Sequence, residues 1–78
     1  SYQSALARLN ATRAARQAAE AVLASELRRF RAGESTTFLV LQREIAVAND
    51  RGLELQAQTD LNKAVVEIQR ATGTILGR

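Results

Sequence analysis

The 78-residue chain contains no cysteine, no histidine and no proline. Without cysteine it has no disulfide framework, and without cysteine and histidine it lacks the ligands that favour zinc or iron. The absence of cysteine fits an oxidising compartment but does not locate the protein. Because proline is missing and 15 residues are alanine, nothing in the composition interrupts a helix. We therefore expect a helical protein with no metal site and no cofactor.

Long apolar runs are also missing from the sequence. No run approaches the roughly 18 apolar residues that a membrane-spanning helix needs. The N-terminal residues show no signal-peptide pattern. The sequence starts without methionine and already in a helical pattern, which indicates a piece of a longer protein. We expect no membrane span within this piece.

The charge is mildly basic, at +3, from ten arginines and one lysine against eight acids. The only dense basic group is Arg28, Arg29 and Arg31, whereas a nucleic-acid site favours a longer basic stripe or stacking aromatics. We expect no nucleic acid and interpret the charges as a solvated face or a contact for an acidic partner. Four oppositely charged pairs have the three- or four-residue spacing of helix-surface pairs: Arg16/Glu20, Glu26/Arg29, Asp60/Lys63 and Glu67/Arg70.

Two long helical patterns are separated by a single break, where Gly33 is followed by a cluster of serine and threonine. The pattern predicts one helix over 1–32, a turn over 33–36, a second helix over 36–73 and a tail over 74–78. The predicted fold is all-α: an antiparallel two-helix coiled-coil hairpin that forms a single unit over 1–78. Such a rod has one seam and no enclosed core, so we expect it to need neighbours.

Apolar residues recur every three or four positions along several lines, which is typical of coiled coils. The lines of the first helix are Tyr2-Leu6-Leu9, Ala15-Ala19-Leu23-Leu27-Phe30 and Ala11-Ala15-Ala18-Val22. Those of the second are Phe38-Leu41-Ile45-Ala48-Gly52-Leu55 and Leu61-Ala64/Val65-Ile68-Ala71-Ile75. A packed array of helices and an isolated antiparallel dimer of hairpins both fit this pattern. We expect Leu23 and Ile45 to be interior residues, and Gly52 to be a close-packing point or a bend.

The residues of the turn favour the end of one helix and the start of the next. Gly33 can take a positive φ without a Cβ penalty, and Ser35 or Thr36 can cap the second helix. Glu34 places an anion near the positive end of that helix. The following residues, 37–41, are apolar or β-branched on all sides of the helix. They either face several neighbours or are exposed at the tip for a partner.

The pattern Phe30-x-x-Gly33-x-Ser35-Thr36-x-Phe38-x-Val40-Leu41-Gln42, with Asn-Lys-Ala at 62–64 and Ala-Thr-Gly-Thr-Ile-Leu at 71–76, resembles the TolC-like outer-membrane factors. The likeness covers nearly the whole chain and is closest to the last helical hairpin of such proteins. These proteins are the trimeric exit ducts of bacterial efflux pumps and type I secretion systems. The resemblance implies a periplasmic hairpin in the wall of a trimeric α-barrel.

The resemblance also implies roles for residues at the turn. The docking rim for a periplasmic adaptor (membrane fusion) protein would be Ala32, Gly33, Glu34, Ser35, Thr36 and Thr37. A pore constriction would involve Phe30, Leu39 and Gln42. Some members have a tyrosine in place of Phe30, acids in place of Leu39 and Gln42, and an arginine in place of Ser35. Here any constriction would be apolar or neutral. In those members the hydrogen bonds of the tyrosine help to hold the closed state, and Phe30 has no hydroxyl to form them.

The residues and the resemblance bear on three classes of function. The first is a duct-wall hairpin that docks an adaptor without chemistry, and the second is a free-standing coiled-coil interaction or scaffold module. The third, an enzyme, is disfavoured because no nucleophile lies beside a base and no phosphate loop is present. Glu44 with Asp50 or Glu54 could form paired carboxylates, but we expect these acids to lie on a solvated helix.

Overall fold

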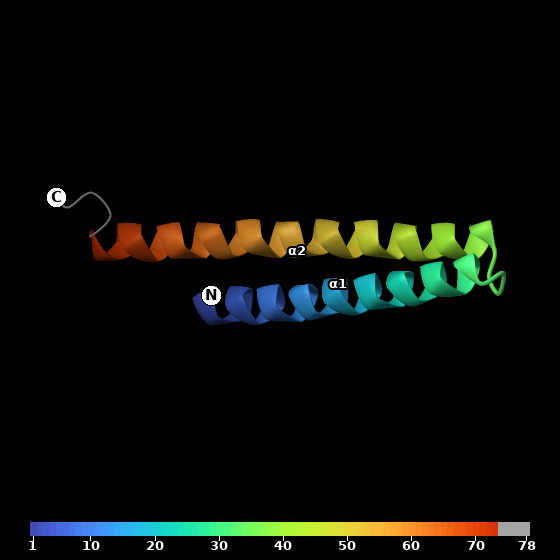
Figure 1. Cartoon of the computed structure of the whole chain (residues 1–78). Helices are drawn as coiled ribbons and strands as arrows, with labels where there is room; N and C mark the ends of the chain where they lie inside the picture. Colours follow the sequence, from blue (N-terminus) through green and yellow to red (C-terminus); the bar gives the residue numbers. More distant parts are fainter. Residues whose placement is uncertain (74–78) are drawn as a thin grey trace.

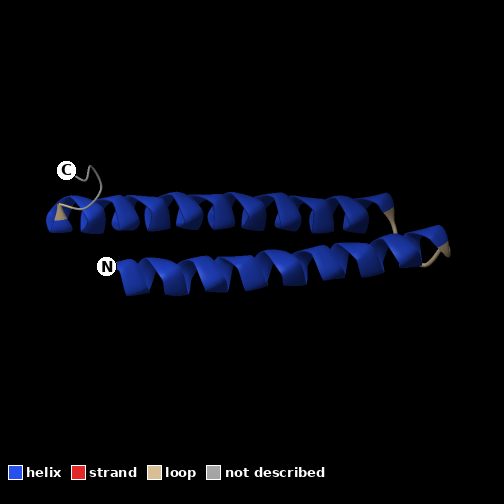
Figure 2. Cartoon of the chain, turned by 60° about the vertical axis from the view of Figure 1, so that its left-hand side comes forward, coloured by secondary structure: helices blue, strands red, loops and turns tan. Residues whose placement is uncertain are grey.

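The structure is a computed structural model that describes residues 1–73. Two helices, α1 (Tyr2–Arg31) and α2 (Thr37–Thr72), lie antiparallel along a rod of 63 × 16 × 15 Å (Figure 1). Within the described residues the regular structure is entirely helical (Figure 2). The predicted all-α hairpin is thus confirmed, and the helix ends lie within one residue of those predicted. The predicted tail, 74–78, lies outside the described residues.

Each helix end is explained by a local interaction. At the start of α1, the hydroxyl of Ser1 accepts a hydrogen bond from the backbone N–H of Ser4, at 3.2 Å. At the end of α2, Gly73 is left-handed at φ 72°, which is the conformation that glycine adopts at helix ends. The predicted stop at Gly73 is confirmed, whereas Gly77 lies outside the described residues.

The seam between the helices follows a regular heptad pattern. All of its members are buried or half-buried: Ala5, Leu9, Thr12, Arg16, Ala19, Leu23 and Glu26 in α1, and Val40, Arg43, Val47, Asp50, Glu54, Ala57, Leu61 and Ala64 in α2. Among the described residues, the buried apolar ones are Ala5, Leu9, Val47 and Ala57. The hairpin therefore has a thin apolar core, and charged side chains occupy several central positions of its seam.

Ion pairs cross the seam along most of its length. The N–O distances are 2.8 Å for Arg8–Asp60, 3.1 Å for Arg13–Glu54, 2.8 Å for Arg16–Glu54, 3.1 Å for Arg51–Glu20 and 3.2 Å for Arg43–Glu26. They join residues at the same height on the two helices, so they favour one register. For Glu26 and Glu54 the expectation of a solvated face was wrong, since both lie in the seam, whereas Glu44 and Glu67 are exposed.

Two of the predicted helix-surface pairs also form. The N–O distances are 3.0 Å for Arg16–Glu20 and 3.6 Å for Glu26–Arg29. Asp60 binds Arg8 on the other helix instead of Lys63, because the seam brings Arg8 within reach. Among residues 1–73, no ion pair joins Glu67 to Arg70.

Candidate functional site

The turn is built from a glycine-ended helix followed directly by a capped one. Gly33 has φ 75°, and its N–H donates to the carbonyl of Phe30 at 3.0 Å. The N–H of Glu34 donates to the carbonyl of Arg29 at 2.8 Å. These two bonds form the Schellman arrangement, which satisfies the last carbonyls of a helix. The predicted left-handed role of Gly33 is confirmed.

Thr36, rather than Ser35, caps α2. Its hydroxyl accepts a hydrogen bond from the N–H of Leu39 at 3.1 Å, and its own backbone is extended. Such a cap stabilises a helix by about 1 kcal/mol relative to alanine. Ser35 is half-buried, and its hydroxyl donates to the carboxylate of Glu26. The sequence could not distinguish these two hydroxyls, because the role of Ser35 depends on a residue nine positions earlier.

The predicted docking rim is mostly accessible. Ala32, Gly33, Glu34, Thr36 and Thr37 are exposed, whereas Ser35 turns inward. A Cβ atom built on Gly33 would meet no atom within 4 Å. The end of the rod therefore presents an open surface of small and hydroxyl-bearing residues around Glu34, which a partner can approach without displacing the chain.

Glu26 lies directly beneath this rim. Its side chain is 4% exposed, and it interacts with three groups from three parts of the hairpin. Ser35 in the turn and Arg43 in α2 donate hydrogen bonds to it, the latter at 3.2 Å, and Arg29 in α1 lies 3.6 Å from it. The hydrogen bond from Ser35 does most to hold the pKa of Glu26 below its usual value, followed by that from Arg43 and the charges of both arginines.

Arg29 extends this network to the backbone of the turn. Its guanidinium donates to the carbonyl of Glu34 at 3.0 Å, while it also faces Glu26. The side chains beneath the rim thus connect the end of α1, the turn and the first turns of α2. This cluster is not evident from the sequence, because the spacing of Glu26 and Arg29 alone indicates a surface pair.

The three residues of the suggested constriction have different surroundings. Phe30 is exposed at the end of α1, and Gln42 is exposed on α2. Leu39 is half-buried. None of the three carries a charge, so a pore lined by them would be neutral or apolar.

A second candidate surface is the side of α2 that faces away from α1. The predicted line Phe38-Leu41-Ile45-Ala48-Gly52-Leu55, here called the outer stripe, lies on this side. Phe38, Leu41, Ile45 and Leu55 are 66%, 50%, 54% and 69% exposed. Ile45 is therefore not an interior residue of the separate hairpin, because the seam uses Val47 instead. Its burial in the parent protein stays a prediction. Helix α2 continues through Gly52 without interruption.

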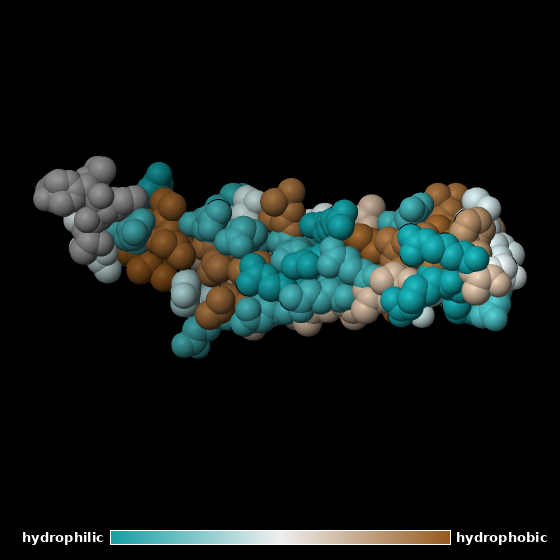
Figure 3. Space-filling view, viewed as in Figure 1, coloured by the Kyte–Doolittle hydropathy of each residue, from teal (hydrophilic) through white to brown (hydrophobic). Residues whose placement is uncertain are grey.

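The opposite side of the hairpin, on α1, carries small residues at heptad spacing. This small-residue stripe consists of Ala7, Ala11, Ala14, Ala18 and Ala21, all of which are exposed. Val22, beside it, is also exposed. Of the line predicted through Leu23, only the central Ala19, Leu23 and Leu27 are half-buried, whereas the line through Ala18 is exposed throughout. On the face shown in Figure 3, hydrophilic residues cover the middle of the rod and hydrophobic ones gather mainly toward its ends.

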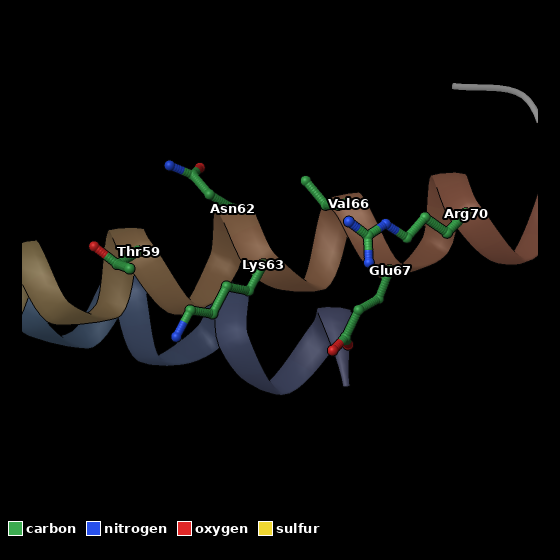
Figure 4. Close-up of a pocket in the computed structure, with 6 residues that line it drawn as sticks. All are labelled: Thr59, Asn62, Lys63, Val66, Glu67 and Arg70. Atoms are coloured by element: carbon green, nitrogen blue, oxygen red, sulfur yellow. The ribbon is translucent and has the colours of Figure 1, made fainter. Parts of the chain in front are cut away.

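A groove lies near the far end of α2, opposite the turn. Its lining residues, Thr59, Asn62, Lys63, Val66, Glu67 and Arg70, all belong to α2 (Figure 4). Because one helix supplies the whole lining, the groove is a surface feature rather than an enclosed site for a small molecule. Residues 1–73 contain no group of three or more acidic side chains that could hold a metal ion.

Glu54, one of the carboxylates considered for catalysis, is occupied by two arginines. Hydrogen bonds from Arg16, then from Arg13, lower its pKa to about 2. A general acid or base works best with a pKa near the operating pH, so this carboxylate is unsuited to either role.

Across the part of the chain that the structure describes, no helix is long and apolar enough to cross a bilayer. A scan of protein-family models and searches of curated proteins and solved structures found no match to this chain.

Proposed function

We propose that the chain is the periplasmic tip hairpin of a trimeric outer-membrane duct for efflux or secretion, where it forms part of the channel wall and docks a periplasmic adaptor. The observation that carries this proposal is the pair of exposed heptad lines on the outward sides of both helices. A helix with a second such line has a face for a second neighbour. A hairpin with two of them suits the interior of a row of helices.

The two outer lines are complementary in size. The outer stripe of α2 presents large side chains such as Phe38 and Ile45, whereas the small-residue stripe of α1 presents alanines. Large side chains pack closely against a helix surface of small residues. A contact between α2 of one hairpin and α1 of the next uses two different surfaces, so it can repeat around an axis and close into a ring. This is the association that a barrel wall requires.

The turn supplies the second half of the proposal. Its rim is exposed at one end of the rod, is held by a glycine in a left-handed conformation, and carries the sequence that resembles the adaptor-docking turn of TolC-like proteins. In this role the hairpin lines the duct and docks the adaptor, and it catalyses no reaction. We place the protein in the periplasm as part of an outer-membrane protein, with the exported compound passing inside the barrel.

The second candidate is a free-standing coiled-coil interaction or scaffold module. The ion pairs across the seam favour it, because they hold α1 on α2 without any neighbour. Such a module would bury the outer stripe of α2 against the same stripe of a second copy. The two candidates therefore predict different contacts for Ala48, which lies in the middle of that stripe.

Cysteine crosslinking distinguishes the two, since the chain has no native cysteine. Ala21 and Ala48 lie at similar heights, because the pairs Glu20–Arg51 and Glu26–Arg43 set the register. For a duct wall, the full-length protein carrying both Ala21→Cys and Ala48→Cys crosslinks between hairpins, and each single variant does not. Efficient crosslinking of Ala48→Cys alone, ending at a dimer, would instead establish the scaffold module and contradict the duct.

A further inference from the structure

We infer that Glu26 is a positioning residue that holds the turn in one conformation, so that the docking rim reaches its partner already ordered. This inference rests on the proposed function, because it assigns the turn a partner. That Glu26 orders the turn is inferred from its burial and its contacts, independently of any partner. Glu26 is 4% exposed, yet the side chains around it come from both helices and from the turn between them.

Each contact of Glu26 fixes a different part of the tip. The bond from Ser35 fixes the residue directly before the cap of α2, because Ser35 and Thr36 are adjacent. The bond from Arg43, at 3.2 Å, joins the second turn of α2 to the end of α1. Arg29 faces Glu26 at 3.6 Å and donates to the carbonyl of Glu34 at 3.0 Å. Arg29 thereby joins this cluster to the exposed backbone of the rim.

Apart from this cluster, the turn is held by local bonds: those of Gly33 and Glu34 at the end of α1 and the cap of Thr36. Gly33 has no side chain, and its conformational freedom favours disorder in an unsupported turn. The rim residues Ala32, Gly33, Glu34, Thr36 and Thr37 are all exposed, so apolar burial does not hold them. A binding surface that is ordered beforehand loses less conformational entropy when the partner docks. A buried anion bonded to the turn provides that order at a site where no apolar core is available.

A buried charge with three partners is also sensitive to the loss of any one of them. Removing one member of a buried pair leaves the other uncompensated, which destabilises the local structure. Since Ser35 contributes only a hydroxyl, Ser35→Ala removes one bond and leaves Glu26 paired with both arginines. Ser35→Thr retains the hydroxyl. This series tests the turn without removing the charge.

The experiment compares four variants of the assembled full-length protein: Glu26→Gln, Ser35→Ala, Ser35→Thr and Glu54→Gln. Glu54 is the matched control, because it is also a seam carboxylate with two arginine partners but lies far from the turn. Hydrogen exchange is followed in peptides that cover the turn and in peptides from the middle of each helix. The second readout is drug susceptibility at equal abundance in the membrane.

We expect Glu26→Gln and Ser35→Ala to raise exchange in the turn by about tenfold or more, and Glu54→Gln to raise it only in mid-helix peptides. Ser35→Thr should restore native exchange. Susceptibility should rise with Glu26→Gln and Ser35→Ala but not with Glu54→Gln. A general loss of packing would instead raise turn exchange equally in Glu26→Gln and Glu54→Gln, and that result would overturn the inference. Unchanged turn exchange in both Glu26→Gln and Ser35→Ala would overturn it as well.

Two further outcomes separate this inference from the proposed function. A turn that loosens while export stays normal means that order in the turn does not matter for docking, which overturns the positioning role of Glu26 and leaves the duct intact. If a folded variant with a bulky residue in place of Gly33 also exports normally, this turn does not dock the adaptor. In that case the proposed function fails, and with it the assignment of Glu26 to docking.

Discussion

Arg16 and Glu54 form a two-bond ion pair across the seam, with Nε to Oε1 at 2.8 Å and Nη2 to Oε2 at 3.3 Å. Their side chains are 23% and 18% exposed, so the pair is partly shielded from water. Arg13 donates a further bond to Glu54, and Glu20 accepts one from Arg16. These four residues occupy the middle of the hairpin, where the apolar core is thin.

Stability should fall in acid, and Glu54 should account for much of the loss. Its pKa is about 2 in the folded chain against an ordinary value of 4.5, and the pKa values of Glu20 and Glu26 are also lowered. A lowered pKa means that the carboxylate stabilises the fold above pH 4.5 and that this stabilisation is lost as the pH falls toward 2. The melting temperature, followed by circular dichroism, should be constant above pH 4.5 and should fall between pH 4.5 and 2.

The matched control for this prediction is Glu54→Gln, which cannot titrate. Its melting temperature should be lower than native near neutral pH and should change less between pH 4.5 and 2. High salt should reduce the difference between the two proteins only partly, since the pair is half-buried. Equal acid dependence in native and variant proteins would mean that other groups control the acid response.

The second prediction separates core from surface on the two helices. Leu9 is 4% exposed in the seam, so Leu9→Ala should destabilise the hairpin by about 2–3 kcal/mol, toward the low end of the usual range for a buried leucine. Ile45 is 54% exposed, so Ile45→Ala should change the stability of the separate hairpin by about 0.5 kcal/mol or less. Chemical denaturation at low micromolar concentration measures both. A large effect of Ile45→Ala there would mean that Ile45 is buried against the same chain.

The third prediction concerns association through the outer stripe. Ile45→Glu places a charge in the middle of this stripe and should shift the protein toward smaller species in sedimentation equilibrium, because a buried unpaired charge is costly. Asn49→Glu is the matched control, since Asn49 is exposed on the same helix but outside the stripe. If both variants shift the equilibrium equally, the change reflects net charge and the stripe is no interface.

The fold was predictable from the sequence because its signals are local. Gly33 followed by Thr36 marks a helix end and a helix start within four residues, and proline is absent from both helices. The turn predicted at 33–36 lies where the structure has it, because glycine and a capping hydroxyl act on their own neighbours.

The identity of the seam could not be read from the apolar pattern alone. Both Ile45 and Val47 belong to regular heptad lines of α2, and the line through Ile45 contains larger apolar residues. The structure places Val47 in the seam because the same line carries Arg43 and Glu54, which pair with acids and arginines of α1. Charge matching between residues 17 to 52 positions apart is invisible to a search for apolar periodicity. The cluster around Glu26 was missed for the same reason.

The last prediction concerns Gly33, whose φ of 75° disfavours any residue with a Cβ. The space around it is open, so strain in the backbone alone should set the cost of substitution. Asparagine tolerates this conformation best, alanine less well, and a β-branched residue least. Melting temperatures should therefore fall in the order native, Gly33→Asn, Gly33→Ala, Gly33→Val, with about 1–2 kcal/mol lost for alanine.

Export should follow a different order if the rim docks an adaptor. All three side chains would intrude on a contact between tips, so even Gly33→Asn should raise drug susceptibility while the protein stays folded and abundant in the membrane. Crosslinking between Thr37 and the adaptor should fall in parallel. A matched change outside the rim, the seam and both stripes, Ala46→Asn on exposed α2 surface, should leave crosslinking at Thr37 unchanged. Normal export and crosslinking by a folded Gly33→Asn protein would show that a side chain fits at this position, and the docking surface would then have to lie elsewhere.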